Sequence, residues 1–294
     1  MLKQRSLIID ANALIHRAYH ALPPLKTSKG EGIWVVYGFI LVLLKALREF
    51  QPDFIVAAFD LPGLTFRHRE FKDYKAKRVK TPEDLSSQIP RVKEALESFN
   101  VPIFEKEGFE ADDIIGTVAK NISELGPKSI ETIIISGDLD TLQLIDEKTK
   151  VYTLKKGLKD TILYDREQVK ARYGIEPEQI VDFKALRGDP SDNIPGVPGV
   201  GEKTAQQLIQ TFGTLKKLYQ ELEEKTENVK RLKPQLIDRL LANKEQAFLS
   251  QMLAQIKKDL PIDFDLKKCQ WKYDREKVSK FFKELEFYTL LKRI

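Results

Sequence analysis

The sequence is poor in the residues that build disulfides and soft-metal sites. Among its 294 residues are one cysteine, Cys269, and three histidines. A lone cysteine excludes a disulfide framework and a zinc site made of thiolates. Because histidines are so few, a bound metal would be held by oxygen ligands, and this favours magnesium, manganese or calcium.

The chain also lacks a hydrophobic run long enough to cross a membrane. The longest run, 33–44, ends at Lys45 and is shorter than the roughly 20 residues that a bilayer requires. Asp10 interrupts the first apolar stretch, so we expect no signal peptide and a cytoplasmic protein. A charged fraction of 32% beside 42% hydrophobic residues indicates a soluble globular chain. The net charge of +5 is a weak indication of a polyanionic partner.

The first half of the chain alternates apolar strands with helical periodicity. Strands are expected at 6–10, 54–60 and 132–136, and helices at 33–49, 83–99 and 111–125. This order predicts an α/β fold with a mostly parallel sheet covered on both faces. We expect a core over 1–174 and an all-helical lobe over 175–294, because strand signals largely vanish after 174.

A basic segment at 61–80 leaves directly from the strand that ends at Asp60. It is rich in Lys and Arg, and Phe66, Phe71 and Tyr74 are interleaved with them. A charge run of this kind is either a solvated face or a surface for nucleic acid. Its position beside the end of a strand favours the second interpretation.

Acidic residues recur where the expected strands end and where one helix begins. Because parallel strands share one carboxyl edge, acids at these points are expected to meet in one cleft. The nine acids are Asp10, Asp60, Glu110, Asp112, Asp113, Asp138, Asp140, Asp189 and Asp192. Taken alone, acids in a first helical turn are commonly caps, and the loop that carries Asp189 and Asp192 reads as a turn.

Together these acids predict a site for divalent cations. Gathered carboxylates repel one another by several kcal/mol unless cations neutralise them. Two hard cations about 4 Å apart would support phosphodiester hydrolysis. A single calcium site is the alternative, although its ligands usually come from one contiguous loop.

The segment at 186–212 has the spacing of a helix–hairpin–helix. Gly199 and Gly201 flank an apolar residue, and Lys203 and Thr204 then begin a helical pattern. Glycines allow the backbone to approach a phosphate, and the amides of a helix N-terminus can bind it. The pattern therefore predicts contact with a nucleic-acid backbone. A plain helix–helix turn is the alternative, and a nucleotide-binding P-loop is excluded because Gly-Lys-Ser/Thr is absent.

Several of these motifs together resemble a known family. IIDAN, AAFD, TFRHREFKDYKAKR, FEADD, SGDLDTLQL, GDPSDNIPGVPGVGEKTA and LEFYTLL are similar to the 5′-nuclease domain of bacterial DNA polymerase I, in the flap endonuclease superfamily. The resemblance covers essentially the whole chain. It implies a PIN-like core, a helical arch at about 61–90, and a helical lobe whose hairpin grips duplex DNA, in many members with a potassium ion.

The resemblance also implies roles for individual residues. Around a first, catalytic metal it places Asp10, Asp60, Glu110 and Asp112, with Asp112 able to bridge. Around a second it places Asp113, Asp138, Asp140, Asp189 and Asp192. The expected metal is Mg²⁺, in two or more ions, with Mn²⁺ as a substitute. Contacts with DNA are implied for His16, Arg17, Arg67, Tyr74, Lys75, Arg78, Gly199, Gly201, Lys203 and Thr204. Lys75 and Arg67 would stabilise charge on the transferring phosphate.

Two residues depart from the family pattern. The polymerase-linked members usually carry a tyrosine where this chain has His16, and an imidazole stacks less well on a base. The residue between the paired acids of the third motif is often basic, and here it is Leu139.

The expected activity is hydrolysis of DNA at 5′ flaps and 5′ ends, by 5′→3′ exonuclease and flap endonuclease action. Such an enzyme would serve replication, repair, RNA-primer removal and Okazaki fragment processing in the cytoplasm, at the bacterial nucleoid. Its partners would be DNA with 5′ flaps, nicks or ends, including RNA-primed ends, and a DNA polymerase in the same or a separate chain. We expect a monomer with no membrane partner.

Three other interpretations remain open. The chain could be a non-catalytic protein that binds branched DNA on the same scaffold. A phosphatase of the haloacid dehalogenase type would need a second Asp at position 12, where Asn12 stands. Val278, Phe281 and Phe282 form either a sliding-clamp motif or the apolar face of a docking helix.

Overall fold

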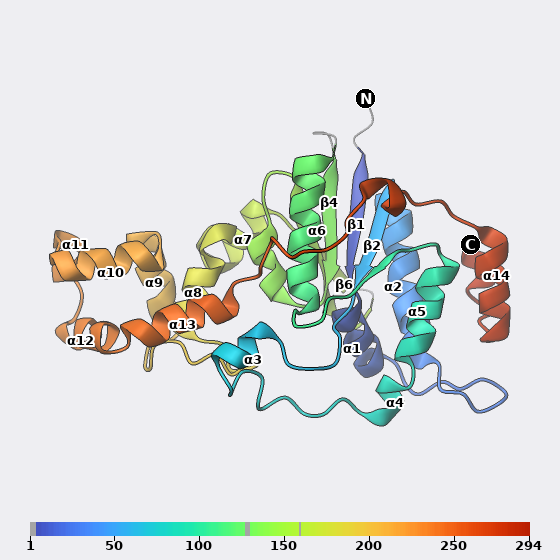
Figure 1. Ribbon diagram of the computed structural model, residues 1–294, viewed down its shortest axis with the longest axis horizontal. Helices are drawn as coiled ribbons and strands as arrows, with labels where there is room; N and C mark the ends of the chain where they lie inside the picture. The colour runs from blue at the N-terminus through green and yellow to red at the C-terminus, as the bar shows by residue number, and fades with distance from the viewer. Residues whose placement is uncertain (1–3, 127–129, 159) are drawn as a thin grey trace.

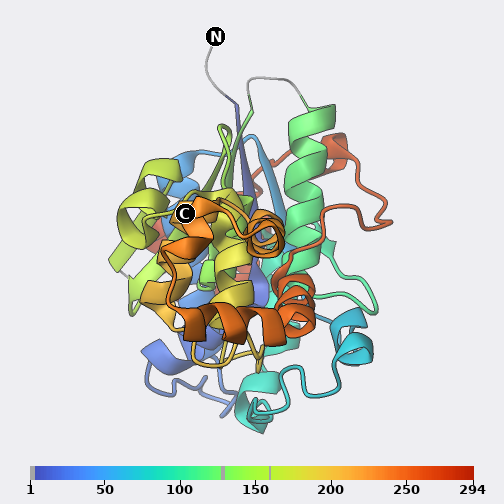
Figure 2. The same ribbon diagram turned by 90° about the vertical axis from the view of Figure 1, so that its left-hand side faces the viewer.

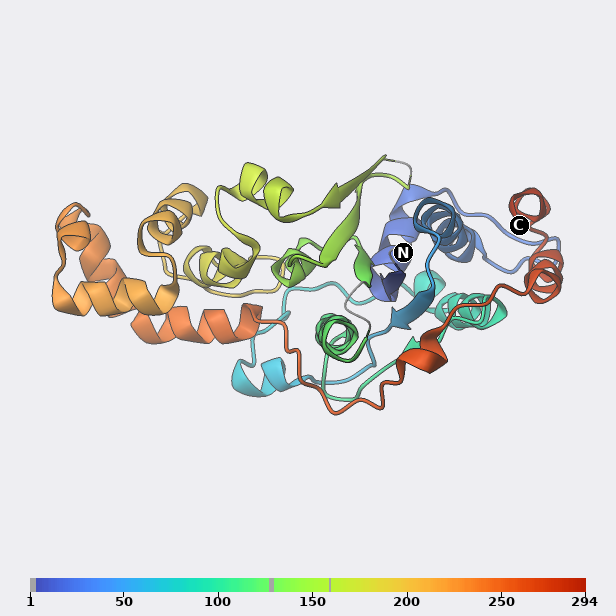
Figure 3. The same cartoon turned by 90° about the horizontal axis from the view of Figure 1, so that it is seen from above.

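The structure is a computed structural model that describes residues 4–126, 130–158 and 160–294. Figure 1 shows an α/β core in the centre, a lobe of helices on its left and one further helix on its right. Seen from above, these parts follow one another along the longest axis of the molecule (Figure 3). The expected α/β fold with a helical lobe is confirmed.

The described residues form a sheet of six strands in the order β3-β2-β1-β4-β5-β6. Pairing is parallel from β3 to β5, and β6 is antiparallel to β5. The strands are β1 (Arg5–Asp10), β2 (Phe54–Ala58), β3 (Ile103–Phe104), β4 (Glu131–Ser136), β5 (Thr149–Lys156) and β6 (Asp160–Tyr164). Because β1, β2 and β4 are parallel neighbours, Asp10, Asp60 and Asp138 follow them at one edge.

Alternate residues of the strands enter two different cores. Leu7 and Ile9 face a core built with α1 (Ala11–Ala21), α2 (Trp34–Phe50) and α5 (Ile89–Ser98). Ile8 faces the opposite core, which contains α6 (Ala111–Leu125) and continues into the helical lobe. A sheet buried on both faces explains why these strands are almost continuously apolar. The long apolar run of the sequence is the buried helix α2, and no described helix is long and apolar enough to cross a bilayer.

The helical lobe extends the second core beyond the edge of the sheet. Seen from the lobe, its helices lie in front of the sheet (Figure 2). The helices of this region are α7 (Arg166–Tyr173), α8 (Ile180–Arg187), α9 (Glu202–Phe212), α10 (Leu215–Glu224), α11 (Glu227–Lys230), α12 (Pro234–Ala242) and α13 (Lys244–Ala254). Leu208 and Phe212 of α9 and Leu218 of α10 belong to the same apolar cluster as Ile134 of the sheet. This shared core fixes the lobe to the α/β core.

The segment at 61–90, expected as a helical arch, is only partly helical. Within that range the structure contains α3 (Phe66–Glu70), a series of turns, and α4 (Glu83–Ser86). The expected helix at 83–99 is divided, because α4 ends at Ser86 and α5 begins again with Pro90 in its first turn. The segment runs below the core in Figure 1, from α3 to α4.

The helical lobe was expected to extend to residue 294, but in the structure the last forty residues leave it. After α13 the chain returns to the core, where Trp271 N donates to Asp53 O at 2.8 Å. Helix α14 (Arg275–Glu284) then lies at the far end of the core from the lobe (Figures 1 and 3). Val278, Phe281 and Phe282 are buried there against α5. These residues form the apolar face of a docking helix, and their burial excludes the clamp-motif alternative.

We predict that Phe282→Ala lowers the free energy of unfolding by about 3–5 kcal/mol, because it removes a fully buried aromatic ring from the core. Urea unfolding followed by circular dichroism measures this change. Lys280→Ala, on the exposed face of the same helix, is the control and should stay within about 0.5 kcal/mol of the parent. Equal stability of the two variants would contradict the docking of α14.

Candidate active site

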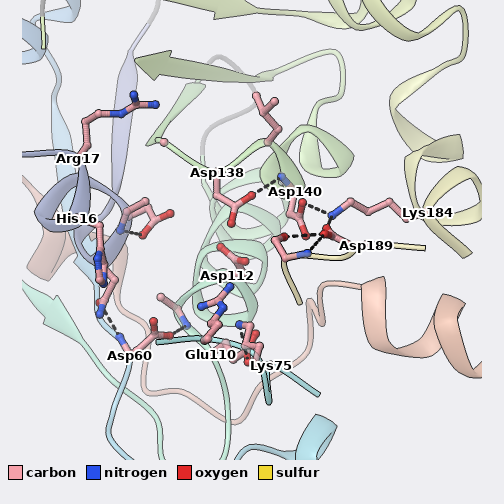
Figure 4. A pocket seen from close by; sticks show the side chains of 18 of the residues that line it. His16, Arg17, Asp60, Lys75, Glu110, Asp112, Asp138, Asp140, Lys184 and Asp189 are labelled. Atoms are coloured by element: carbon pink, nitrogen blue, oxygen red, sulfur yellow. Dashed lines mark hydrogen bonds and ion pairs between the residues drawn. The ribbon is translucent and has the colours of Figure 1, made fainter. Parts of the chain in front are cut away.

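A cleft of about 630 Å³ opens at the carboxyl ends of β1, β2 and β4. Figure 4 shows acidic side chains from the strand ends, from α6 and from the loop after α8 projecting into it. Eleven of the residues expected at the site line this cleft: Asp10, His16, Arg17, Asp60, Lys75, Arg78, Glu110, Asp112, Asp138, Asp140 and Asp189. The structure therefore brings together acids that lie up to 179 positions apart in the chain.

Asp10 stands where β1 passes directly into α1. Its carboxylate caps α1 by accepting from Ala13 N at 3.0 Å, and it accepts from Ser136 Oγ at the end of β4 at 2.5 Å. Burial nevertheless raises the pKa of Asp10 to about 7, against the lowering effect of these two bonds. The folded protein thus holds this carboxylate at a considerable electrostatic cost.

Asp60 and Glu110 meet at the N-terminus of α6. Ala111 N donates to Asp60 Oδ1 at 2.7 Å, so a first-turn amide of α6 fixes the acid that follows β2. Glu110 is the N-cap of α6, and Lys75 Nζ lies 2.9 Å from its Oε1. Burial raises the pKa of Asp60 above its usual value, although the Ala111 amide and Lys75 oppose this.

Asp138, Asp140 and Asp189 form the opposite wall of the cleft. Asp138 caps the short 3₁₀ helix Leu139–Leu144 by accepting from Asp140 N at 2.9 Å. Lys184 of α8 pairs with both Asp140 and Asp189, and its Nζ lies 2.6 Å from Asp189 Oδ2. Burial and the nearby Asp138 raise the pKa of Asp140 to about 7. Burial opposes ionisation of Asp189 too, yet Lys184 and Ser191 lower its pKa to about 2.

Asp112 is the least compensated acid of the site. It lies between the two groups, on the first turn of α6 (Figure 4). Burial and then Asp138, Asp10 and Asp140 raise its pKa well above the usual value. A bound cation would stabilise the ionised form of an acid in this environment. The carboxylate oxygens around it are ligands that suit magnesium or manganese.

Lysines neutralise part of this charge in the structure. Lys75 forms an ion pair with Glu110, and Lys184 forms ion pairs with Asp140 and Asp189. Within the described ranges, no three His, Cys, Asp or Glu side chains are already closed around a position that could hold an ion. Divalent cations would therefore compete with the two lysines for the carboxylates.

Asp113 does not lie in the cleft, contrary to the expectation that it holds the second metal. Its side chain is fully buried and forms a bidentate ion pair with Arg67, with distances of 2.7 and 2.8 Å. Asp112 and Asp113 are adjacent on a helix and therefore point about 100° apart, so only one of them can face the cleft. The sequence signal FEADD carries both acids but does not distinguish their roles.

Arg67 and Tyr74 were both expected to contact DNA, but the structure buries their side chains inside the protein. Arg67 is 2% exposed and Tyr74 is 3% exposed. The Tyr74 hydroxyl lies 3.1 Å from Glu110 Oε2 and 3.2 Å from Asp192 Oδ2. Neither side chain is accessible to a base or a phosphate in this structure.

Asp192 is placed beside the cleft lining rather than in it. Its carboxylate accepts from Arg78 Nη2 at 2.6 Å and from Tyr74, and Lys75 Nζ lies 3.8 Å away. Lys75 N also donates to Asp192 O at 2.9 Å. Asp192 therefore ties the basic segment at 61–80 to the loop after α8, and its carboxylate is occupied by cationic side chains of that segment.

Arg78, Lys75 and His16 also line the cleft, and the first two are ion-paired to Asp192 and Glu110. Arg78 keeps half of its side chain exposed, and Lys75 lines the cleft in a left-handed conformation with φ of 55°. His16 projects from α1 with part of its side chain in solvent, and partial desolvation at the cleft, then the nearby His20 and Arg78, lower its pKa and favour the neutral ring. Arg17 also lines the cleft but donates to Leu154 O at 2.8 Å.

The expected helix–hairpin–helix is formed by α8, the loop 188–201 and α9. Gly199 has φ of +75°, and a Cβ there would lie 2.6 Å from Arg239 Nη1. The loop is anchored to α13, because Ser250 Oγ accepts from Gly196 N at 3.0 Å and Gln246 Nε2 donates to Gly196 O at 2.7 Å. Gly201 is the N-cap of α9, and Lys203 in its first turn is exposed.

Lys184 is the main residue of the site that the sequence reasoning missed. It is 9% exposed, on a helix whose other buried residues are mostly apolar. A lysine among the apolar residues of this helix, five positions before Asp189, was the available signal. His20, Tyr173 and Arg187 also line the cleft and were not expected there.

A mostly parallel sheet covered on both faces thus carries clustered carboxylates at its carboxyl edge. Two family models match the chain. Residues 5–174 match the 5′-3′ exonuclease N-terminal resolvase-like domain, and residues 175–277 match the 5′-3′ exonuclease C-terminal SAM fold. The chain belongs to the 5′-3′ exonuclease family.

Curated relatives agree with this assignment. DNA polymerase I of Bacillus subtilis (strain 168) is 43% identical over 99% of the chain and 32% of its own length. The thermostable DNA polymerase I of Thermus aquaticus is 37% identical over 98% of the chain and 33% of its own length. The chain therefore spans about a third of the length of the relatives it matches.

Solved structures share the fold at lower identity. T5 5′-exonuclease with bound zinc has a TM-score of 0.69 at 21% identity, covering 97% of this chain and 99% of that one. The catalytic core of Rad2 in complex with DNA substrate has a TM-score of 0.63 at 21% identity, covering 100% of this chain and 94% of that one. At these identities the likeness establishes the fold.

We predict that Asp112→Asn stabilises the metal-free protein. The pKa of Asp112 is higher when folded than when unfolded, so folding weakens as the pH rises above the unfolded pKa of about 3.9, and an amide removes that cost. In EDTA at pH 8, the free energy of unfolding in urea should rise by roughly 1–3 kcal/mol. Asp238→Asn removes the same charge from the exposed face of α12 and should change nothing measurable. Destabilisation by Asp112→Asn would contradict the described electrostatics.

Proposed function

We propose that the chain hydrolyses DNA phosphodiesters at 5′ ends and at the junctions of 5′ flaps with duplex. The observation that supports this most strongly is Asp112, an acid held among Asp10, Asp138 and Asp140 with no lysine or arginine ion-paired to it in the described structure. Membership of the 5′-3′ exonuclease family supports the direction of attack. The proposal extends to primer removal, Okazaki fragment processing and repair, where such ends and flaps arise.

Two groups of carboxylates would hold the divalent cations. Asp10, Asp60, Glu110 and Asp112 form the first, and Asp138, Asp140 and Asp189 form the second, with Asp112 between them. Mg²⁺ is the proposed metal and Mn²⁺ its substitute. Bound cations would supply a hydroxide nucleophile at neutral pH and stabilise the leaving oxygen. Backbone amides or hydroxyls hold the carboxylates of Asp10, Asp60 and Asp138, and this would fix where the cations bind.

The basic side chains of the cleft would bind and orient the scissile phosphate. Lys75 and Arg78 lie at the cleft on the segment that follows β2. A cation that replaces Lys75 at Glu110 would free its charge for the phosphate oxygens, and the exposed part of Arg78 would lie beside it. His16 offers a neutral ring on which a terminal base can stack. Arg17 is proposed as a further phosphate contact at the same wall.

The hairpin would hold the duplex at a fixed distance from the cleft. The amides of the first turn of α9 and the exposed Lys203 can bind a backbone phosphate without reading sequence. Gly199, Gly201 and Thr204 allow close approach of the strand, and a potassium ion is proposed at the same turn. The rigid anchoring of this loop on α13 would make the distance to the cleft constant.

The wider context is likewise proposed. The curated relatives are DNA polymerases about three times longer than this chain, so a polymerase in the same or a separate chain is the proposed partner. The substrate would be DNA with 5′ flaps, nicks or RNA-primed ends, bound by one copy of the chain in the cytoplasm, at the nucleoid.

We predict that Asp112→Asn abolishes cleavage of a 5′-labelled flap duplex but keeps its binding. The parent should release the flap as a short oligonucleotide in magnesium and not in EDTA, because the cations need the carboxylates. Denaturing gels measure the products, and fluorescence anisotropy in calcium measures binding. Asp238→Asn is the charge-matched control and should cut like the parent.

Two outcomes would contradict the proposed function. Equal turnover by Asp112→Asn and the parent would remove Asp112 from the metal site. Tight binding of the flap by the parent without cutting, in both magnesium and manganese, would instead favour a non-catalytic protein that binds branched DNA.

A further inference from the structure

The guanidinium of Arg67 uses all five of its N–H donors inside the protein. Nε donates to Leu253 O at 2.9 Å. Nη1 donates to Asp113 at 2.7 Å and to Glu110 at 3.4 Å. Nη2 donates to Asp113 and to Gln255 O, each at 2.8 Å. Because an arginine has five donors, none is left for a DNA phosphate while this arrangement persists.

The carboxylate of Asp113 is saturated in the same way. Oδ1 accepts from Arg67 and from Lys257 N at 2.9 Å. Oδ2 accepts from Arg67 and from Glu110 N at 3.2 Å. Two carboxylate oxygens offer about four acceptor positions, and all are occupied. Asp113 is therefore a structural acid, although Asp112 beside it faces the cleft.

This ion pair joins three segments that are distant in the sequence. Arg67 comes from α3, Asp113 from the first turn of α6, and the carbonyls of Leu253 and Gln255 from the end of α13 and the chain after it. Figures 1 and 3 both show α3 beside the end of α13. We call this ion pair and its backbone partners the arch anchor.

Backbone hydrogen bonds connect the arch anchor to the turns that lead to Lys75. Phe71 N donates to Arg67 O at 2.9 Å, and Tyr74 N donates to Phe71 O at 3.0 Å, so the turns after α3 are built on Arg67. The Tyr74 ring packs in a small core with Val181, Ile194 and Leu253. Its hydroxyl donates hydrogen bonds to Glu110 and Asp192. Lys75 forms ion pairs with the same two acids.

We propose that Arg67, paired with Asp113 and assisted by Tyr74, is a positioning residue that places Lys75 over the cleft without contacting DNA or metal. This inference rests on the proposed nuclease function. It separates the basic residues of the segment at 61–80 into two groups. Arg67 acts through the protein interior, whereas Lys75 and Arg78 act on the substrate. Misplacement of a catalytic group by about 1 Å costs up to about 100-fold in rate.

The test compares Arg67→Lys with the parent on the flap duplex. Lysine keeps the charge but loses the planar fork that bonds Asp113 on two sides. The single-turnover cleavage rate at saturating protein and Mg²⁺ should fall roughly 10- to 100-fold. The slope of log Kd against log salt should stay at the parent's value, because no phosphate contact is lost. Arg69→Lys, on the exposed face of the same helix, is the matched control and should cut like the parent.

Lys203→Ala calibrates the salt measurement. This variant removes a proposed phosphate contact and should lower the slope by about one. A similar loss of slope in Arg67→Lys would overturn the proposal and make Arg67 a DNA contact. An unchanged cleavage rate in Arg67→Lys would overturn it too.

Asp113→Asn and Tyr74→Phe test the same arrangement from other sides. Asp113→Asn should slow cleavage while leaving the Mg²⁺ concentration at half-maximal rate unchanged, and a clear rise in that concentration would make Asp113 a metal ligand. Tyr74→Phe keeps the buried ring and so keeps the fold, but loses the hydroxyl, and should slow cleavage roughly fivefold to tenfold. If Arg67→Lys fails to fold, as thermal unfolding in EDTA would show, an undiminished rate in Tyr74→Phe overturns the proposal.

Failure of the proposed nuclease function gives a different result from failure of this inference. In the first case the parent and Arg69→Lys do not cut the flap in any metal. In the second case the parent cuts, and the variants either keep its cleavage rate or differ from it in salt slope or Mg²⁺ dependence.

Discussion

The structure depends on the mutual repulsion of carboxylates gathered at one edge of the sheet. Two like charges 4 Å apart repel each other by on the order of 4 kcal/mol near a protein surface. Several groups of the cleft reduce this repulsion. The amide of Ala111 and the hydroxyl of Ser136 stabilise Asp60 and Asp10. Lys75 and Lys184 neutralise acids on opposite walls. Within the described residues no lysine or arginine is ion-paired to Asp112, and burial among other acids raises its pKa, so an added cation would stabilise this position most.

The cost of assembling these acids is met by packing on both faces of the sheet. The core shared by α6 and the helical lobe fixes the cleft to the hairpin, and the opposite core fixes it to α14. A site held by such packing need not reorganise when substrate binds, which is the condition for electrostatic stabilisation of a transition state. The basic segment between β2 and α5 is the exception. The segment is buried near its start, at Arg67, while Arg78 and its neighbours are exposed.

The sequence predicted the architecture and most of the acids of the site, because strand ends and helix starts are local features. Asp10, Asp60 and Asp138 could be placed in one cleft from parallel strand order alone. The separation of Asp112 from Asp113 could not, since it depends on Arg67, 46 positions away from Asp113. The burial of Arg67 and Tyr74 was hidden for the same reason. Strand β3, with two residues, is too short to recognise, and β5 carries lysines that mask its alternation. The return of α14 to the core depends on contacts with α2 and α5 that no local pattern shows.

The central claim is that the carboxylate cleft exists to hold divalent cations, and a crystal structure of the chain grown with Mn²⁺ tests it most directly. Anomalous difference maps should show two ions about 4 Å apart, with Asp112 between them and with Lys75 and Lys184 displaced from their acids. A map without ions in the cleft at millimolar Mn²⁺, with both lysines still on Glu110 and Asp140, would contradict the claim.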